Sequence, residues 1–186
     1  YFSHKLVIKC IENDIAIIFC DKKHSPLTQL ISSYGMTHRL QRIQSQFQLS
    51  GRTRDRIWKK IVVNKIINQS KCLENNLHNE NVKLLVNLAK AVSSGDKSNK
   101  EAQAARIYFK DLYGKQFKRG RYNDIINSGL NYGYSILRSF IKKELALHGF
   151  EMSLGIKHYS KENPFNLADD IIEVFRPFVD NIVYEI

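Results

Sequence analysis

One imidazole and three carboxylates lie close together near the end of the chain. His158 is followed by Asp169, Asp170 and Glu173, in a segment that reads as a helix beginning near Asn166. Asp170 and Glu173 are three residues apart and share a helix face, so both carboxylates can point toward one divalent metal ion. Taken alone, the spacing favours a plainer interpretation, in which the aspartates complement the helix dipole and His158 is a surface histidine.

A further carboxylate, Glu101, opens a separate helical segment. Ser98 and Glu101 have the spacing of a capping box, which would turn the glutamate back onto the backbone of the cap. Against that, Ala102, Ala104 and Ala105 leave little bulk on the helix, so that another helix or a substrate could approach closely. Spacing does not decide between a cap and a metal ligand.

The chain is strongly basic. Its 186 residues include 29 Lys and Arg against 18 Asp and Glu, for a formal net charge of +11 and a pI near 9.6. Such a charge attracts a polyanion, and nucleic acid is the first candidate. We expect no membrane association, because no apolar run approaches the roughly 20 residues that span a bilayer and the opening residues lack a signal-peptide pattern. Cys10, Cys20 and Cys72 form neither a disulfide framework nor a zinc motif, which favours a reducing cytoplasm.

Basic residues concentrate between residues 38 and 71, with a smaller group at 115–121. The first segment has nine basic residues and a single acidic one, Asp55, whereas residues 150–186 reverse the balance with seven acidic and three basic. The one-sided excess predicts phosphate contacts, which supply affinity but little sequence information. For any single basic residue, the alternative is that it lies on a solvent-exposed helix face and contacts no phosphate. The candidate DNA-binding residues are Arg39, Arg42, Arg52, Arg54, Arg56, Lys59, Lys60, Arg119 and Arg121.

Helices must position most of these side chains. Residues 2–11 read as a short amphipathic helix, and the β-branched run 15–19 reads as a buried strand. From residue 36 onward, apolar residues recur at helical spacing, and the segments end at glycines such as Gly95, Gly114 and Gly149. We therefore predict a mainly α protein, with a small α/β region over residues 1–35 and an all-helical domain over residues 36–186.

Three separated segments have a familiar order and spacing. They are Glu101–Phe109, Asn131–Arg138, and Gly155–His158 leading to Leu167–Pro177. In these segments the sequence resembles the family of CRISPR-associated endonucleases and integrases, the catalytic subunits of the spacer-acquisition complex. The resemblance runs through essentially the whole chain and is greatest to the type II subgroup. It implies that residues 1–35 are a remnant of the family's N-terminal β-rich domain with its linker, that residues 36–186 are the catalytic domain, and that both ends are incomplete.

The resemblance also implies a site and a reaction. The family's metal ligands fall on Glu101, His158 and Glu173, with Asp170 as an auxiliary candidate, and the capping interpretation of Glu101 is demoted. In the implied reaction, a 3'-hydroxyl of a short DNA fragment attacks a phosphodiester of the CRISPR repeat. Mg²⁺ or Mn²⁺ would act as Lewis acid on that phosphate. A second interpretation makes His158 the general acid for the leaving oxygen.

The partners implied are double-stranded DNA, both as spacer precursor and as CRISPR repeat, and a small dimeric adaptation partner protein. Family members form homodimers through the N-terminal domain, and type II systems add accessory proteins and the effector nuclease. Two other functions compete with integration. One is a non-catalytic basic helical module, whose binding would weaken with salt and ignore chelators. The other is a general metal-dependent nuclease without integration activity.

Overall fold

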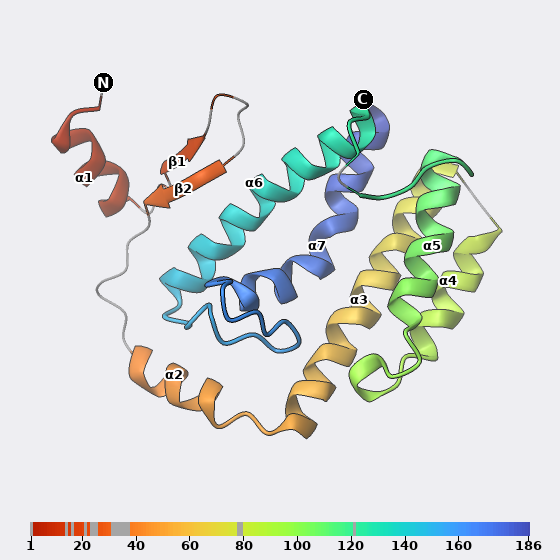
Figure 1. Ribbon diagram of the computed structural model, residues 1–186, viewed down its shortest axis with the longest axis horizontal. Helices are drawn as coiled ribbons and strands as arrows, with labels where there is room; N and C mark the ends of the chain where they lie inside the picture. Colours follow the sequence, from red (N-terminus) through yellow and green to blue (C-terminus); the bar gives the residue numbers. More distant parts are fainter. Residues whose placement is uncertain are drawn as a thin grey trace. The chain divides into compact units, whose positions relative to one another are not determined.

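The computed structural model describes residues 2–13, 15, 17–20, 22, 26–30, 38–77, 80–120 and 122–186. Figure 1 shows that these residues are mainly helical, which confirms the predicted fold class. The elements are α1 (His4–Glu12), β1 (Ile17–Cys20), β2 (Pro26–Leu30), α2 (Arg39–Phe47), α3 (Gly51–Leu77), α4 (Asn81–Lys90), the 3-10 turn η1 (Ser94–Asp96), α5 (Lys100–Tyr113), α6 (Ile125–Leu147) and α7 (Asn166–Glu185). None of the helices described is long and apolar enough to cross a membrane.

The first elements are a helix and a two-stranded antiparallel hairpin. The predicted opening helix is confirmed as α1, and the predicted strand is confirmed as β1, which pairs with β2 so that Ile17 lies opposite Leu30. The prediction that this run is buried is wrong, since Ile15 is 56% exposed and Phe19 is 37% exposed. The sequence interpretation did not include β2. It begins at Pro26. Proline has no backbone N–H to donate to a neighbouring strand, and the first residue of a strand is one of the positions that tolerate it. The next helix was expected from residue 36 but begins at Arg39, and residues 31–37 lie outside the described part of the chain.

The chain divides into two compact units. One comprises Tyr1–Leu49 and Ser135–Asp169, and the other comprises Ser50–Tyr134 and Asp170–Ile186. Both α6 and α7 therefore contribute residues to each unit. The predicted domain boundary between residues 35 and 36 falls among residues that are not described, so it stays a prediction.

The second unit is built around the 27-residue helix α3, which packs against α4 and α5 (Figure 1). Apolar side chains of α3 recur at helical spacing and are buried, including Trp58, Val62, Ile66 and Leu73. Tyr108 of α5 is fully buried as well. Polar residues, however, interrupt the buried stripe of α3, among them Lys65, which is 9% exposed, and Gln69, which is 1% exposed. Buried lysines are rare unless they are paired, so this position requires an explanation.

A glycine permits close packing of α6 on α7 within the second unit. A Cβ atom added at Gly133 would lie 2.5 Å from Cγ1 of Val179. Real Cβ atoms do not approach a methyl carbon so closely, so any larger residue would push the two helices apart or force Val179 from its rotamer. Because α7 carries Glu173, the missing side chain of Gly133 helps to set where that carboxylate lies.

In the first unit, polar contacts hold the segment between α6 and α7. The side chain of Gln46 on α2 exchanges two hydrogen bonds of 2.9 Å with the backbone of Glu151. The Arg138 guanidinium donates to both carboxylate oxygens of Asp169, at 2.5 and 2.9 Å, and Asn163 donates to the same carboxylate at 2.6 Å. Asp169 is therefore used to anchor the start of α7.

Candidate active site

In the second unit, three helices bring two carboxylates into contact with one lysine ammonium group. Glu101 comes from α5, Glu173 from α7 and Lys65 from α3. The Lys65 Nζ atom lies 2.5 Å from Glu101 Oε1 and 2.5 Å from Glu173 Oε2. Glu173 is further bound by Arg176, whose Nε lies 2.7 Å from Oε1. Glu101 and Glu173, which were predicted to ligate one metal ion, are 72 positions apart in the sequence. Their carboxylates contact the same ammonium group.

The side chain of Glu101 is available because another residue caps α5. Both oxygens of Asp96 accept backbone hydrogen bonds, one from Lys100 N at 2.8 Å and one from Glu101 N at 3.0 Å. The N-cap residue Asn99 adopts a left-handed conformation and makes no side-chain cap hydrogen bond. The capping-box interpretation of Ser98 and Glu101 is therefore wrong: a carboxylate from the preceding turn satisfies the first N–H groups.

Charges in this cluster stabilise one another. Burial alone would raise the pKa of Glu173, but attraction and hydrogen bonds from Lys65 and Arg176 outweigh it and lower that pKa. Burial likewise opposes the charge on Lys65, yet the Glu173 and Glu101 carboxylates raise its pKa. The ionised forms of Glu173 and Lys65 thus favour each other. Removing one partner of such a buried pair costs roughly 3–5 kcal/mol, because the other charge is left uncompensated.

The cluster lies in a cavity of about 450 Å³. Its lining contains oxygen donors and positive charges side by side: Lys65, Gln69, Glu101, Phe109, Arg119, Gly120, Asn131, Tyr134, Glu173, Arg176 and Asp180. The Gln69 Oε1 atom is buried there without a hydrogen-bond partner among the described residues. The two carboxylates are oxygen ligands that suit a hard divalent cation, and the unpaired amide oxygen can accept a hydrogen bond from a donor in the cavity. No three His, Cys, Asp or Glu side chains of the described ranges gather closely enough to hold a metal by themselves.

One wall of the cavity is a tyrosine between two guanidinium groups. Arg176 lies 4.5 Å from the centre of the Tyr134 ring and Arg119 lies 5.1 Å from it. Arg119 is oriented by the side-chain oxygens of Asn127 and Asn131, at 2.9 and 2.7 Å. Planar guanidinium groups held in this way suit bidentate contacts with phosphate. The cavity therefore offers carboxylates for a cation and arginines for an anion.

The Tyr134 hydroxyl donates a hydrogen bond to Asp180, which is 1% exposed. Burial raises the pKa of Asp180 to about 6, although Tyr134, Tyr108, Arg176 and Lys65 each lower it. The pKa of this buried carboxyl thus lies well above its ordinary value of 3.8.

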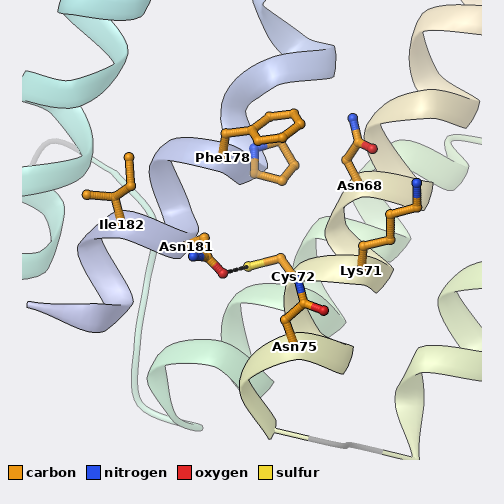
Figure 2. Close-up of a pocket in the computed structure, with 8 residues that line it drawn as sticks. Asn68, Lys71, Cys72, Asn75, Phe178, Asn181 and Ile182 are labelled. Carbon is orange, nitrogen blue, oxygen red and sulfur yellow. Dashed lines mark hydrogen bonds between the residues drawn. The ribbon is translucent and has the colours of Figure 1, made fainter.

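A second cavity, of about 340 Å³, lies between α3 and α7 in the same unit (Figure 2). Cys72 and Asn181 face each other in it, with Cys72 Sγ 3.8 Å from Asn181 Oδ1. Burial raises the pKa of the Cys72 thiol, so the thiolate that a nucleophile would need is disfavoured. With Pro177, Phe178 and Ile182 in its lining, this cavity lacks the paired charges of the first one.

Known proteins resemble the whole chain. The family model described as CRISPR associated protein Cas1 matches residues 1–186. The chain belongs to the Cas1 family. It is 39% identical over 170 residues to a CRISPR-associated endonuclease Cas1 of Neisseria meningitidis serogroup C (strain 8013), a match that covers 91% of this chain and 55% of the relative. The chain thus spans about half the length of that Cas1 protein.

Solved structures share the Cas1 fold of this chain. A casposase bound to integration product superposes with a TM-score of 0.78 at 22% identity, covering 98% of this chain and 56% of the casposase chain. A chain of a partial Cas6-RT-Cas1–Cas2 complex superposes with a TM-score of 0.68 at 22% identity, covering 98% of this chain and 61% of that chain. At these identities the likeness concerns the fold. The family membership predicted from the three sequence segments is confirmed, and the type II assignment stays a prediction.

Asp170 and His158 are the two remaining predicted ligands. Asp170, on α7, is fully buried and is not part of the cavity lining. His158 is exposed on the segment between α6 and α7 and belongs to the first unit. Its participation in a metal site with Glu101 and Glu173 therefore stays a prediction.

The predicted DNA-binding residues of this Cas1 chain have different environments. Arg52, Arg56, Lys59 and Lys60 are exposed on the first turns of α3, and Arg39 is exposed on α2. Arg54 is half-buried on α3. Arg42 donates a hydrogen bond to the backbone carbonyl of His148, and Arg119 lines the first cavity. Arg121 lies outside the described residues.

The sequence interpretation missed Lys65 and Gln69 as site residues. Lys65 was counted with the basic residues of the 38–71 segment, and Gln69 was not considered. A signal was nevertheless present: residues 58, 62, 66 and 73 mark an apolar face, and positions 65 and 69 fall on that same face, where a polar side chain needs a buried partner.

Proposed function

We propose that this chain carries the catalytic domain of a divalent-metal-dependent DNA endonuclease and integrase, which inserts short DNA fragments into a CRISPR array. The observation that carries the proposal is the meeting of Glu101 and Glu173 on a single cation, in a cavity that also presents Arg119 and Arg176. Membership of the Cas1 family and the 39% identity with a CRISPR-associated endonuclease Cas1 support it. Since the chain spans about half of that relative, the activity of the whole protein is part of the proposal.

In this proposal Glu101, Glu173 and His158 hold Mg²⁺ or Mn²⁺, and Asp170 is an auxiliary residue. The ion would supply Lewis acidity at the scissile phosphate and neutralise charge that develops there. The chain's own residues would bind and orient the DNA. Arg119 and Arg176 would fix phosphate oxygens, and their anchoring by Asn131 and Glu173 reduces the reorganisation that the reaction requires.

The reaction balances as a transesterification. The 3'-oxygen of the incoming fragment forms a bond to the repeat phosphorus, its proton leaves, and the bond from phosphorus to the repeat's own 3'-oxygen breaks. That leaving oxygen then takes up a proton, for which His158 is the second interpretation. No covalent enzyme intermediate is required, and the raised pKa of the Cys72 thiol argues against that residue as a nucleophile.

Double-stranded DNA is the proposed partner. The exposed face that Arg52, Arg56 and Lys60 share, at spacings of four residues along α3, would contact phosphates without reading the sequence. A casposase structure bound to integration product and a Cas1–Cas2 complex are structural neighbours, which supports DNA and a partner protein for this chain. A homodimer of the full-length protein and a small dimeric adaptation protein complete the proposed assembly.

A strand-transfer assay tests the proposal. The purified protein is incubated with a short DNA fragment and a supercoiled plasmid bearing the CRISPR repeat, with Mn²⁺ or with a chelator. We expect joining in Mn²⁺ only, and a loss of at least about 100-fold in Glu101→Gln, Glu173→Gln and His158→Ala, the range typical of removing one electrostatic contact to the reacting phosphate. Lys90→Met, at an exposed position of α4 outside the basic segment, is the control and should join normally.

Each rival function predicts a different outcome of that assay. Plasmid nicking without joining would favour a general nuclease. DNA binding that persists in chelator, with no metal-dependent product in any condition, would favour the non-catalytic basic module.

A further inference from the structure

Lys65 lies where a metal ion would have to lie if Glu101 and Glu173 were its ligands. Its ammonium group contacts one oxygen of each carboxylate at 2.5 Å. A divalent ion bound by the same two carboxylates would take oxygen atoms at about 2.0–2.2 Å. The ammonium and the ion carry charge of the same sign, so both cannot occupy this position in a buried site without strong repulsion.

A second acceptor for the ammonium group lies one helical turn further along α3. Gln69 is four residues after Lys65, so the two side chains share a helix face. Gln69 is 1% exposed, and its Oε1 atom has no hydrogen-bond partner within the part of the chain that the structure describes. Leaving a buried acceptor unpaired is destabilising and unusual in a native protein. Both residues line the same cavity.

We propose that Lys65 is a displaceable counter-ion for the metal site. In the metal-free protein its ammonium group holds Glu101 and Glu173 together, and when the ion binds, the ammonium turns to Gln69 Oε1. The lysine stays charged throughout, and its flexible four-carbon stem with three donors permits the turn without movement of the backbone. The inference rests on the proposed function, because it takes Glu101 and Glu173 as the ligands.

This arrangement has two consequences. The carboxylates are kept in place before the metal arrives, since Lys65 prevents the two negative charges from separating. The metal, in turn, binds more weakly than it would to the free carboxylates, because it must displace charge-assisted hydrogen bonds. Such bonds contribute about 1.5–3 kcal/mol each, so the competition weakens metal affinity by at least about tenfold.

The test measures binding of Mn²⁺ alone by titration calorimetry, together with the thermal unfolding midpoint with and without Mn²⁺. Lys65→Met keeps the length of the side chain and removes the charge. We expect at least about tenfold tighter Mn²⁺ binding, a lower midpoint without metal and a larger rise of the midpoint on adding Mn²⁺. Lys71→Met, an exposed lysine of the same helix, should behave as the wild type.

Gln69→Leu tests where the ammonium goes. In the wild-type background it should weaken Mn²⁺ binding by roughly three- to tenfold, because the displaced ammonium loses its acceptor. In the Lys65→Met background the same substitution should have no effect on Mn²⁺ affinity, since no ammonium group is present to donate a hydrogen bond to residue 69. A double-mutant cycle over these four proteins isolates the coupling between residues 65 and 69.

Several results would overturn the inference. Unchanged or weaker Mn²⁺ binding in Lys65→Met would mean that Lys65 does not compete with the metal. An equal effect of Gln69→Leu in both backgrounds would mean that Gln69 does not receive the ammonium.

If Lys65→Met fails to fold, Lys65→Gln, which can still donate to a carboxylate, replaces it with the same expectation. Glu101→Gln separates the two proposals: if its Mn²⁺ binding equals that of the wild type, the metal site itself is wrong.

Discussion

Asp180 should make the stability of this protein depend on pH in the direction opposite to that of most carboxylates. Its ordinary pKa is 3.8, and burial raises it to about 6 in the folded protein. Between these two values the folded chain holds a proton that the unfolded chain has lost. The free energy of unfolding therefore falls as the pH rises through this window, and is constant with respect to this group above and below it.

The magnitude follows from the size of the shift. A shift from 3.8 to about 6 corresponds to about 3 kcal/mol at 1.36 kcal/mol per unit. Asp180→Asn removes the titration while keeping an oxygen that can accept from the Tyr134 hydroxyl. The difference in unfolding free energy, variant minus wild type, should thus rise by about 2.4 kcal/mol between pH 4 and pH 7, most of the full change.

Urea unfolding of the wild type and Asp180→Asn at several pH values between 3.5 and 8 measures this difference, and groups that titrate alike in both proteins cancel. Tyr134→Phe is the informative companion, because loss of the hydroxyl removes one hydrogen bond that lowers the pKa of Asp180. Its window should extend to higher pH. A difference that stays flat from pH 4 to pH 7 would refute the reasoning, since it would mean that Asp180 is ionised in the folded protein throughout.

Three further predictions concern packing, charge and DNA. Gly133→Ala should lower the free energy of unfolding by about 1–3 kcal/mol through its clash with Val179; Val179→Ala in the same chain should recover part of the loss in chemical denaturation. Glu173→Gln should cost roughly 3 kcal/mol at pH 7, because Lys65 and Arg176 lose their shared carboxylate; the difference from wild type should shrink as the pH falls below 4.5, since the pKa of Glu173 is lowered. A triple alanine variant on the exposed face of α3 should reduce the slope of log affinity for duplex DNA against log salt by about 3, measured by fluorescence anisotropy, and an unchanged slope would place DNA elsewhere. The three positions are Arg52, Arg56 and Lys60.

The helical pattern was readable from the sequence because it depends on local spacing. Apolar periodicity and terminal glycines predicted helices from residue 36 onward. The first of them begins at Arg39, and α5 ends at Gly114 as expected. The start of α7 at Asn166 was also predicted. The capping of α5 was not, because Ser98 and Asp96 offer competing caps within the same turn, and only the backbone path decides which oxygen reaches the free N–H groups.

The candidate site was only partly readable. Resemblance to a known family singled out Glu101 and Glu173, and nothing in their own spacing joined residues so far apart in the chain. Lys65 looked like one more basic residue of a phosphate-binding segment, since its charge is visible in the sequence and its burial is not. Gln69 carried even less signal, because an amide becomes notable only when its oxygen is buried without a partner.

By itself, the sequence determined the mainly helical fold, the strong positive charge and the membership of the Cas1 family, all of which depend on composition, local periodicity and residue order. Tertiary structure alone decided that Glu101 and Glu173 meet on Lys65, that Asp96 caps the helix of Glu101, and that Asp169 binds Arg138. The physical reason is that electrostatic partners are chosen by distance and burial. Both quantities arise when α3, α5 and α7 pack together, and neither is a property of sequence spacing.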